Sequence, residues 1–316
     1  MQSTRRLPEE LARTVDRFWF GSAGVTVRAA LRSAAGIITP AWCIGCAEQD
    51  VVLCELCAEE LHLLTRTPFA AEQQALALPL RMDSQAITVL PVSAAGRYEG
   101  LLARSVLAFK DHGAIGLGAA LGPGLARALR RAAERAAQES GAQSPGPQPP
   151  LQPQPQAQSQ SQPWLLVGPP PSLRSRLTRG FDPVQVLLTH ALGGSGRELH
   201  HGGLRLLPVS GLLRQTRPAA LRSLIPGQGQ QKSRGARARR RRSVGTIELT
   251  PRGRTLLPGA DVLLVDDVLT SGSTLAELHR VLRSAGARIH VAAVFAAAPG
   301  PGAEAEYSLV SASPEA

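Results

Sequence analysis

The sequence predicts an α/β fold with a mainly parallel sheet flanked by helices. Residues 262–265 form an apolar run, as a strand buried on both faces does. After a short turn that contains glycine, a helical pattern of apolar residues begins at Leu275. A second apolar run, Ile289 to Ala298, follows Gly286 at the distance expected for the next buried strand. Strands that alternate with helices in this way are typical of a parallel sheet covered on both sides.

Apolar periodicity places the remaining elements along the chain. A helix is expected within residues 1–30, where Leu11, Val15, Phe18 and Trp19 recur on one face. The other predicted elements are, in order, a short helix at 58–64, helices at 101–109 and 117–135, a strand at 164–167, a helix at 184–192, a strand at 204–209, a loop at 227–242 and an extended piece at 245–249.

Composition divides the chain into segments. Residues 138–163 are rich in Gln, Pro and Ser and have few apolar side chains. They cannot bury enough surface to offset the entropy of the chain, so they are expected to form a disordered insertion. The predicted organisation is a helical lead-in at 1–39, a four-cysteine zinc knuckle at 40–66, the first part of the main domain at 85–137, the insertion at 138–163, the remainder of the main domain at 164–298 and a disordered tail at 299–316.

Two carboxylates, Asp266 and Asp267, follow the first apolar run directly, and a turn rich in hydroxyl groups comes next. Hydroxyls and backbone N–H groups at a helix N-terminus suit a phosphate, and a glycine in the turn allows a close backbone approach with positive φ. The carboxylates suit a sugar, because each accepts several hydrogen bonds. The pattern therefore predicts a site for a ribose 5-phosphate. The residues of the turn are Thr270, Ser271, Gly272, Ser273 and Thr274.

The alternative interpretation of this stretch is an ordinary strand, loop and capped helix. A buried pair of acids is costly without a ligand or partner, which favours the binding site.

Residues 262–274 resemble the phosphoribosyl-pyrophosphate (PRPP) loop of type I phosphoribosyltransferases, which has four apolar residues, two acids, two apolar residues and a Thr/Gly-rich turn. The resemblance implies that Asp266 and Asp267 bind the ribose hydroxyls, that Thr270 to Thr274 bind the 5′-phosphate, and that Mg²⁺ accompanies PRPP. Thr270 stands where enzymes of 6-oxopurine salvage carry an aspartate, so the resemblance disfavours that subclass.

All four cysteines occur in two Cys-x-x-Cys pairs, Cys43 with Cys46 and Cys54 with Cys57. Two such pairs can supply four thiolates to one tetrahedral structural zinc ion per chain. Disulfides are unlikely in a cytosolic chain, and a redox Cys-x-x-Cys usually occurs singly. The alternative is a group of free buried thiols. His62 is expected on the surface of the following helix, because four thiolates already complete the metal shell.

The cysteine pairs and the PRPP loop together resemble the ComF family of competence-type phosphoribosyltransferase-like proteins. Weaker matches extend from about residue 31 to about residue 298, among them Phe109-Lys110-Asp-His-Gly113 and the stretch from Arg174 to Asp182. The resemblance implies a type I phosphoribosyltransferase-like sheet with a small N-terminal zinc-binding subdomain. It also implies a phosphoribosyl ligand, single-stranded DNA and a competence helicase as partners in DNA uptake.

The same resemblance implies pyrophosphate contacts from Arg174, Arg176, Arg179 and Arg239. The alternative for the first three is a basic surface loop or helix N-terminus. The chain departs from the family pattern in three places. Gly168 and three prolines stand in place of the Pro-Val-Pro-Leu that often precedes the arginines, and Asp182 and Arg242 replace asparagines.

The formal net charge of +11 favours partners that carry phosphate. Residues 232–242 are rich in Lys and Arg and contain no acid, so they could contact pyrophosphate or a nucleic-acid backbone, or form a solvated loop. The run has no interleaved aromatic residues, and base stacking is therefore not supported. No targeting segment is visible and no apolar run is long enough to span a membrane, so a cytoplasmic location is expected.

Three functions remain open at this point. The first is a ComF-type protein of DNA uptake, which predicts DNA binding that weakens steeply with salt. The second is a PRPP-dependent transferase with an unknown nitrogen acceptor, which predicts release of pyrophosphate. The third is a regulator that binds PRPP without turning it over.

Overall fold

The computed structural model describes residues 42–82, 87–111, 113–141, 162–172, 180–194, 197–216, 219 and 244–300. Several predictions fall on other parts of the chain and lie outside the described residues. They are the lead-in helix, most of the Gln/Pro/Ser insertion, the loop at 227–242 and most of the tail.

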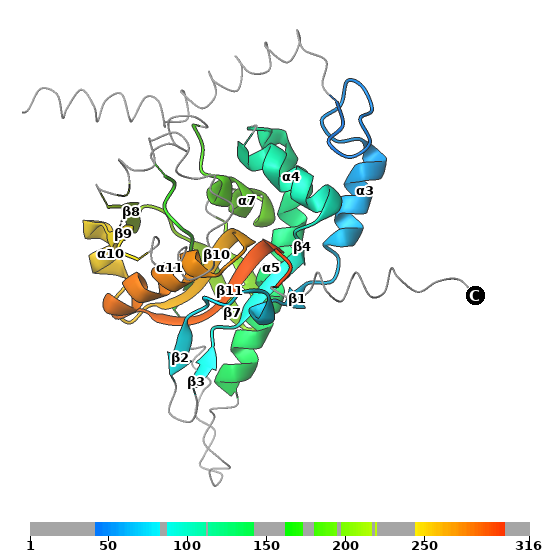
Figure 1. Cartoon of the computed structure of the whole chain (residues 1–316). Coiled ribbons are helices and arrows are strands. Elements are labelled where there is room, and N and C mark those ends of the chain that lie inside the picture. Colours follow the sequence, from blue (N-terminus) through cyan, green and yellow to red (C-terminus); the bar gives the residue numbers. More distant parts are fainter. Residues whose placement is uncertain are drawn as a thin grey trace, which may run out of the picture.

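A seven-stranded sheet, with strand order β1-β4-β11-β10-β5-β7-β6, forms the centre of the molecule (Figure 1). The four pairings from β4 across to β7 are parallel, whereas the edge strands β1 and β6 pair antiparallel. The predicted α/β class with a mainly parallel sheet is therefore confirmed. The strands are β1 (Phe69–Ala70), β4 (Val92–Arg97), β5 (Trp164–Val167), β6 (Leu199–His201), β7 (Leu204–Pro208), β10 (Asp261–Leu269) and β11 (Arg288–Ala297).

The central strands are buried on both faces, which is why they appear as unbroken apolar runs. In β10, Leu263 and Val265 belong to one apolar cluster, and Val262 and Leu264 belong to a second cluster across the sheet. Each fully buried side chain of this kind contributes roughly 1.5–3 kcal/mol. Because successive side chains of the strand point to opposite faces of the sheet, β10 packs against the helical layers on both sides.

Helices cover both faces of the sheet (Figure 1). The first cluster takes apolar side chains from α4, α5 and α7, and the second takes them from α11. A small helix, α3, packs beside α4 and α5. The helices are α3 (Glu55–Leu64), α4 (Gly100–Asp111), α5 (Gly118–Gly141), α7 (Pro183–Ala191), α10 (Pro251–Leu256) and α11 (Ser273–Ser284), with short 3₁₀ turns η1 (Glu72–Gln74) and η2 (Ile115–Leu117).

Most predicted elements are present, with small shifts at their ends. The strand predicted at 164–167 is β5, and the run from Ile289 is β11. The largest difference concerns β10, which continues through the acid pair to Leu269 instead of ending before it. A tertiary contact explains the extra length: β11 runs beside β10, so that Asp266 pairs with Val294 and Leu269 pairs with Ala297.

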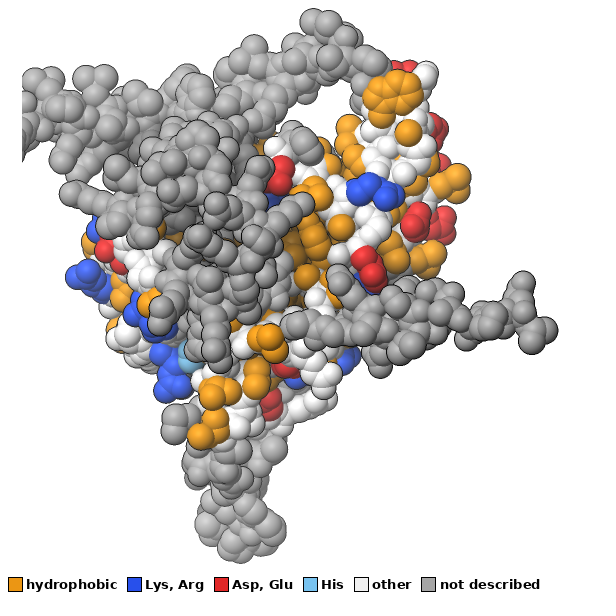
Figure 2. Space-filling view, viewed as in Figure 1, with side chains coloured by type: hydrophobic (Ala, Val, Ile, Leu, Met, Phe, Trp, Pro, Cys, Tyr) orange, Lys and Arg blue, Asp and Glu red, His pale blue; other side chains and the backbone are white. Residues whose placement is uncertain are grey.

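Two small antiparallel sheets stand apart from the main one, β2 (Leu80–Met82) with β3 (Ile87–Val89), and β8 (Leu213–Gln215) with β9 (Ile247–Leu249). The extended piece expected at 245–249 is present as β9, whereas β2, β3 and β8 were not predicted from the sequence. Strands of two or three residues carry too little periodicity to be recognised. Apolar side chains are visible on the surface around the β2–β3 hairpin and at the α3 end of the molecule (Figure 2). The exposed ones include Trp42, Leu56, Leu80 and Ile87.

Candidate functional site

The acid pair lies where the strand connections change direction. From β5 the chain passes through α7 to β7 on one side, and from β10 it passes through α11 to β11 on the other. The crevice at the carboxyl ends of two such neighbouring strands is the usual ligand site of an open α/β sheet. Here β5 leads into residues 168–172, and β10 leads into the hydroxyl-rich turn.

Asp266 and Asp267 are both buried, with 8% and 7% of their surface exposed. The backbone N–H of Asp267 donates to Asp266 Oδ1 at 2.9 Å, and the N–H of Val268 donates to Asp267 Oδ1 at 2.8 Å. These two bonds orient the carboxylates from within the strand. Both side chains line a pocket, so their remaining oxygen lone pairs face a ligand-sized space.

Lys110 supplies a positive charge beside this pair. Its Nζ lies 3.0 Å from Oδ1 and 2.7 Å from Oδ2 of Asp267. The lysine comes from the last turn of α4, far from the acids in sequence. No motif in the sequence marks Lys110 as a site residue, although the Phe109-Lys110 segment is part of the family resemblance.

The pKa of the Asp266 carboxyl group is strongly raised. Burial raises the pKa of its carboxyl group from 3.8 to about 8, and the neighbouring Asp267 charge adds to the increase, while Lys110 acts in the opposite direction. Asp266 is therefore protonated at neutral pH in the ligand-free protein and can donate as well as accept a hydrogen bond. Strongly perturbed carboxyl groups in a cleft are typical of functional sites.

We expect the free energy of unfolding to fall as the pH rises from about 4 to about 8. Between these values native Asp266 keeps its proton while the unfolded chain has released it, so the native state binds more protons and loses stability with rising pH. The effect is on the order of a few kcal/mol. Urea unfolding at about pH 5 and about pH 9 measures it, with Asp266→Asn as the comparison. If the free energy of unfolding depends on pH equally in the wild type and in Asp266→Asn, the raised pKa of Asp266 is contradicted.

The hydroxyl-rich turn forms the entry to α11. Gly272 adopts φ +82° at the N-cap, a conformation that other residues rarely adopt, and a Cβ there would lie 3.0 Å from the backbone N of Leu78. Ser271 Oγ lies 3.0 Å from Ser273 Oγ. The turn therefore brings hydroxyls and the first N–H groups of a three-turn helix to one place, as a phosphate site requires.

A pocket of about 440 Å³ joins the acid pair to the turn. Its volume lies in the range of small-molecule sites. Asp266, Asp267, Thr270 and Thr274 line it, whereas Ser271, Gly272 and Ser273 do not. The opposite wall comes from the loop after β5 and the start of α7, with Pro169, Pro170, Pro171, Ser172, Asp182, Pro183 and Val184.

A third wall comes from β8, β9 and α11, and it was not predicted from the sequence. Glu277 is 2% exposed, and its carboxylate accepts from the Gly245 N–H at 2.8 Å and from Arg280. Gln215 also lines the pocket, and among the described residues its buried Oε1 has no hydrogen-bond partner. No sequence motif marks these residues, because only the fold brings them to the pocket.

The predicted pyrophosphate contacts, Arg174, Arg176, Arg179 and Arg239, lie outside the described residues, so their place relative to the pocket stays a prediction.

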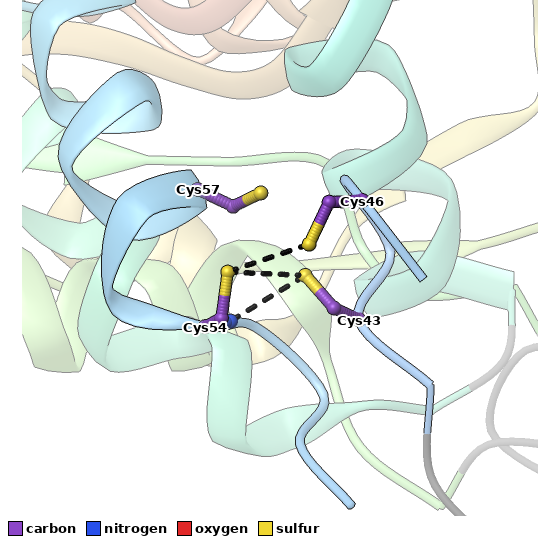
Figure 3. A group of neighbouring side chains, drawn as sticks. All are labelled: Cys43, Cys46, Cys54 and Cys57. Atoms are coloured by element: carbon purple, nitrogen blue, oxygen red, sulfur yellow. Dashed lines mark hydrogen bonds between the residues drawn. The ribbon is translucent and has the colours of Figure 1, made fainter. Parts of the chain in front are cut away.

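The four cysteines lie together, with their sulfur atoms within 4.8 Å of one another (Figure 3). Cys54 Sγ lies 3.7 Å from Cys43 Sγ and 3.6 Å from Cys46 Sγ. A Zn–S bond is about 2.3 Å long, so sulfurs around a tetrahedral zinc lie about 3.8 Å apart, whereas a disulfide is about 2.05 Å. The cluster thus fits a zinc ion and contains no disulfide.

The electrostatics of the cluster favour a thiolate at Cys43. Burial acts to raise its pKa, but the backbone N–H groups of Cys46, Cys54 and Gly45 outweigh this and lower the pKa to about 6. The Cys54 N–H lies 3.4 Å from Cys43 Sγ. Such N–H···S contacts orient and stabilise metal-binding sulfurs.

The cysteine cluster packs directly on α4. Arg104 donates to the carbonyl oxygens of Ile44 at 2.9 Å and Gly45 at 3.4 Å. A Cβ at Gly45 would collide with Cys57 Sγ, so the close packing requires glycine there. Cys43, Cys54 and Cys57 belong to the apolar cluster that contains Leu101 of α4. His62 is exposed on α3, as predicted.

Comparison with known proteins gives a match over the C-terminal part of the chain. A family model described as a phosphoribosyl transferase domain matches residues 222–313, a range that contains β10, the acid pair and the turn. A search of curated proteins found no match. The chain therefore carries a phosphoribosyl transferase domain in its C-terminal part. Among the described residues, no helix is long and apolar enough to cross a membrane.

Proposed function

We propose that this protein binds PRPP, or a related ligand that carries ribose 5-phosphate, in the pocket beside β10. Asp266 and Asp267 bind the two ribose hydroxyls, and the turn from Thr270 to Thr274 binds the 5′-phosphate. The observation that carries the proposal is the buried acid pair, which lies in one pocket with the N-terminus of α11. The phosphoribosyl transferase domain match over the same residues supports it.

The pocket's own residues bind and orient the sugar. Protonated Asp266 donates to one hydroxyl and the oxygens of Asp267 accept from the other, so a cis-diol matches the pair. The helix N-terminus fixes the opposite end of the sugar. With both ends held, C1 is presented to an attacking group in a defined orientation.

Mg²⁺ fits this site as a companion of the ligand. Carboxylate and sugar oxygens are hard ligands of the kind that Mg²⁺ prefers, and it commonly binds through a few carboxylates together with substrate phosphates. Asp267 is the residue that would hold it, either directly or through water, because protonated Asp266 donates to the sugar. When bound, it neutralises charge on the pyrophosphate.

The proposed activity is transfer of the phosphoribosyl group to a nitrogen acceptor, in which a C–N bond forms at C1 as the C–O bond to pyrophosphate breaks. The second candidate is a PRPP-sensing regulator that binds without turnover. Thr270 lines the pocket where an aspartate would serve a 6-oxopurine, which argues against that class of acceptor.

The assignment to the ComF family and to DNA uptake rests on the resemblance of the cysteine pairs and the PRPP loop. The close cluster of four cysteines supports the metal part of that resemblance, and we propose one structural zinc ion per chain held by Cys43, Cys46, Cys54 and Cys57. From the resemblance we also propose single-stranded DNA and a competence helicase as partners. From the sequence we propose a cytoplasmic location.

Calorimetry with three sugars tests the proposed site. PRPP and ribose 5-phosphate should both bind in the presence of Mg²⁺. The matched control, 2-deoxyribose 5-phosphate, should bind about 10-fold or more weakly, because one carboxylate hydrogen bond has no partner. Equal binding of the deoxy sugar, or no binding of PRPP, would rule out the diol site. A screen of nitrogenous bases for pyrophosphate release then separates a transferase from a sensor.

A further inference from the structure

The pocket proposed to bind PRPP is lined by more acidic than basic side chains. Four carboxyl groups line it, those of Asp182, Asp266, Asp267 and Glu277, and that of Asp266 keeps its proton in the ligand-free protein. PRPP is itself a polyanion, so its pyrophosphate group needs positive charge near C1. Among the described residues that line the pocket, Lys110 is the only lysine or arginine.

Two of the four carboxylates are already engaged in holding the fold. Asp182 caps α7 by accepting from the Val184 N–H at 3.0 Å. Glu277 accepts from Gly245 and is paired with Arg280. The charge that a ligand meets in the pocket is therefore set mainly by the acid pair and by Lys110.

The ammonium group of Lys110 and a ribose diol compete for the same atoms. Nζ contacts both oxygens of Asp267, which are the oxygens that a ribose hydroxyl would approach. The Lys110 side chain is 36% exposed while that of Asp267 is 10% exposed, so the lysine is the partner that can move. Its long stem lets the ammonium shift within the pocket while α4 stays in place.

We propose that Lys110 recognises the pyrophosphate of the bound ligand and so distinguishes PRPP from ribose 5-phosphate. This inference rests on the proposed function. When the sugar takes Asp267, the displaced ammonium moves to the adjacent anion on C1, which keeps its charge paired. Ribose 5-phosphate has no phosphate at C1, and its binding therefore leaves Lys110 without that contact.

Affinities of the two sugars for Lys110→Met test this inference. PRPP affinity should fall about 10- to 100-fold, as for loss of a hydrogen bond between charged groups, while ribose 5-phosphate affinity should hold or rise. Lys110→Arg keeps the charge and should restore most of the preference for PRPP. Thermal melting checks that each variant is folded.

The outcomes separate this inference from the function on which it rests. If the wild type binds neither sugar, the proposed function and the inference both fail. If the wild type binds both and Lys110→Met weakens both by the same factor, Lys110 only positions Asp267 and the inference alone fails.

A second measurement does not depend on a variant at Lys110. The chain has two lysines, Lys110 and Lys232, so Lys232→Arg leaves one lysine signal after reductive ¹³C-methylation. In NMR spectra this signal should take different positions with PRPP and with ribose 5-phosphate. Identical positions with the two sugars would overturn the inference.

Discussion

The double substitution Asp266→Asn/Asp267→Asn should abolish measurable PRPP binding while leaving the protein folded. The two acids supply hydrogen bonds to the sugar, worth roughly 1 kcal/mol from protonated Asp266 and roughly 1.5–3 kcal/mol from Asp267, so the combined loss should be about 100-fold or more. Asparagine has nearly the same shape, and the variant removes two buried acids whose proximity is unfavourable. The loss of binding should therefore be accompanied by equal or greater stability.

Calorimetry with PRPP and Mg²⁺ measures the affinity, and urea unfolding measures the stability. Asp261→Asn is a matched control, because Asp261 begins the same strand but pairs with Arg288 and His290 and does not line the pocket. It should keep wild-type affinity. Unchanged binding by the double variant would remove the acid pair from the site.

The substitution Cys57→Ser should release the proposed zinc ion and destabilise the protein by several kcal/mol. Structural zinc sites contribute folding free energy directly, because the four-ligand site exists only in the folded state. Cys57 is 6% exposed and packs in the same apolar cluster as α4. Loss of the metal should therefore loosen the contact between α3 and α4 as well as the loop around Cys43.

Metal analysis of protein purified without chelators should give one zinc per chain for the wild type and none for Cys57→Ser. The matched control is His62→Ala, which changes the nearest histidine after Cys57 at an exposed position and should keep both the zinc and the stability. Chelation of the wild type should reproduce the loss of stability. Wild-type protein without metal would contradict the zinc site.

The main elements and the two candidate sites could be predicted from local patterns. The apolar runs of β10 and β11 and the periodicity of α11 indicate strands and a helix without reference to the rest of the chain. The acid pair, the hydroxyl-rich turn and the cysteine pairs are contiguous motifs, so their residue types and spacing are visible in sequence. The length of β10 could not be predicted from the sequence, because the last residues of the strand are held by pairing with β11.

The amino-acid sequence by itself determined the strand that carries Asp266 and Asp267, the turn at Gly272 and the four cysteines, because each depends on residues close together in the chain. Only the tertiary structure decided that Lys110 contacts Asp267, that Gln215 and Glu277 line the same pocket, and that the cysteine cluster packs on the helix that carries Lys110. These contacts join residues far apart in sequence. They arise from the way the helices cover the sheet, and no local periodicity encodes that arrangement.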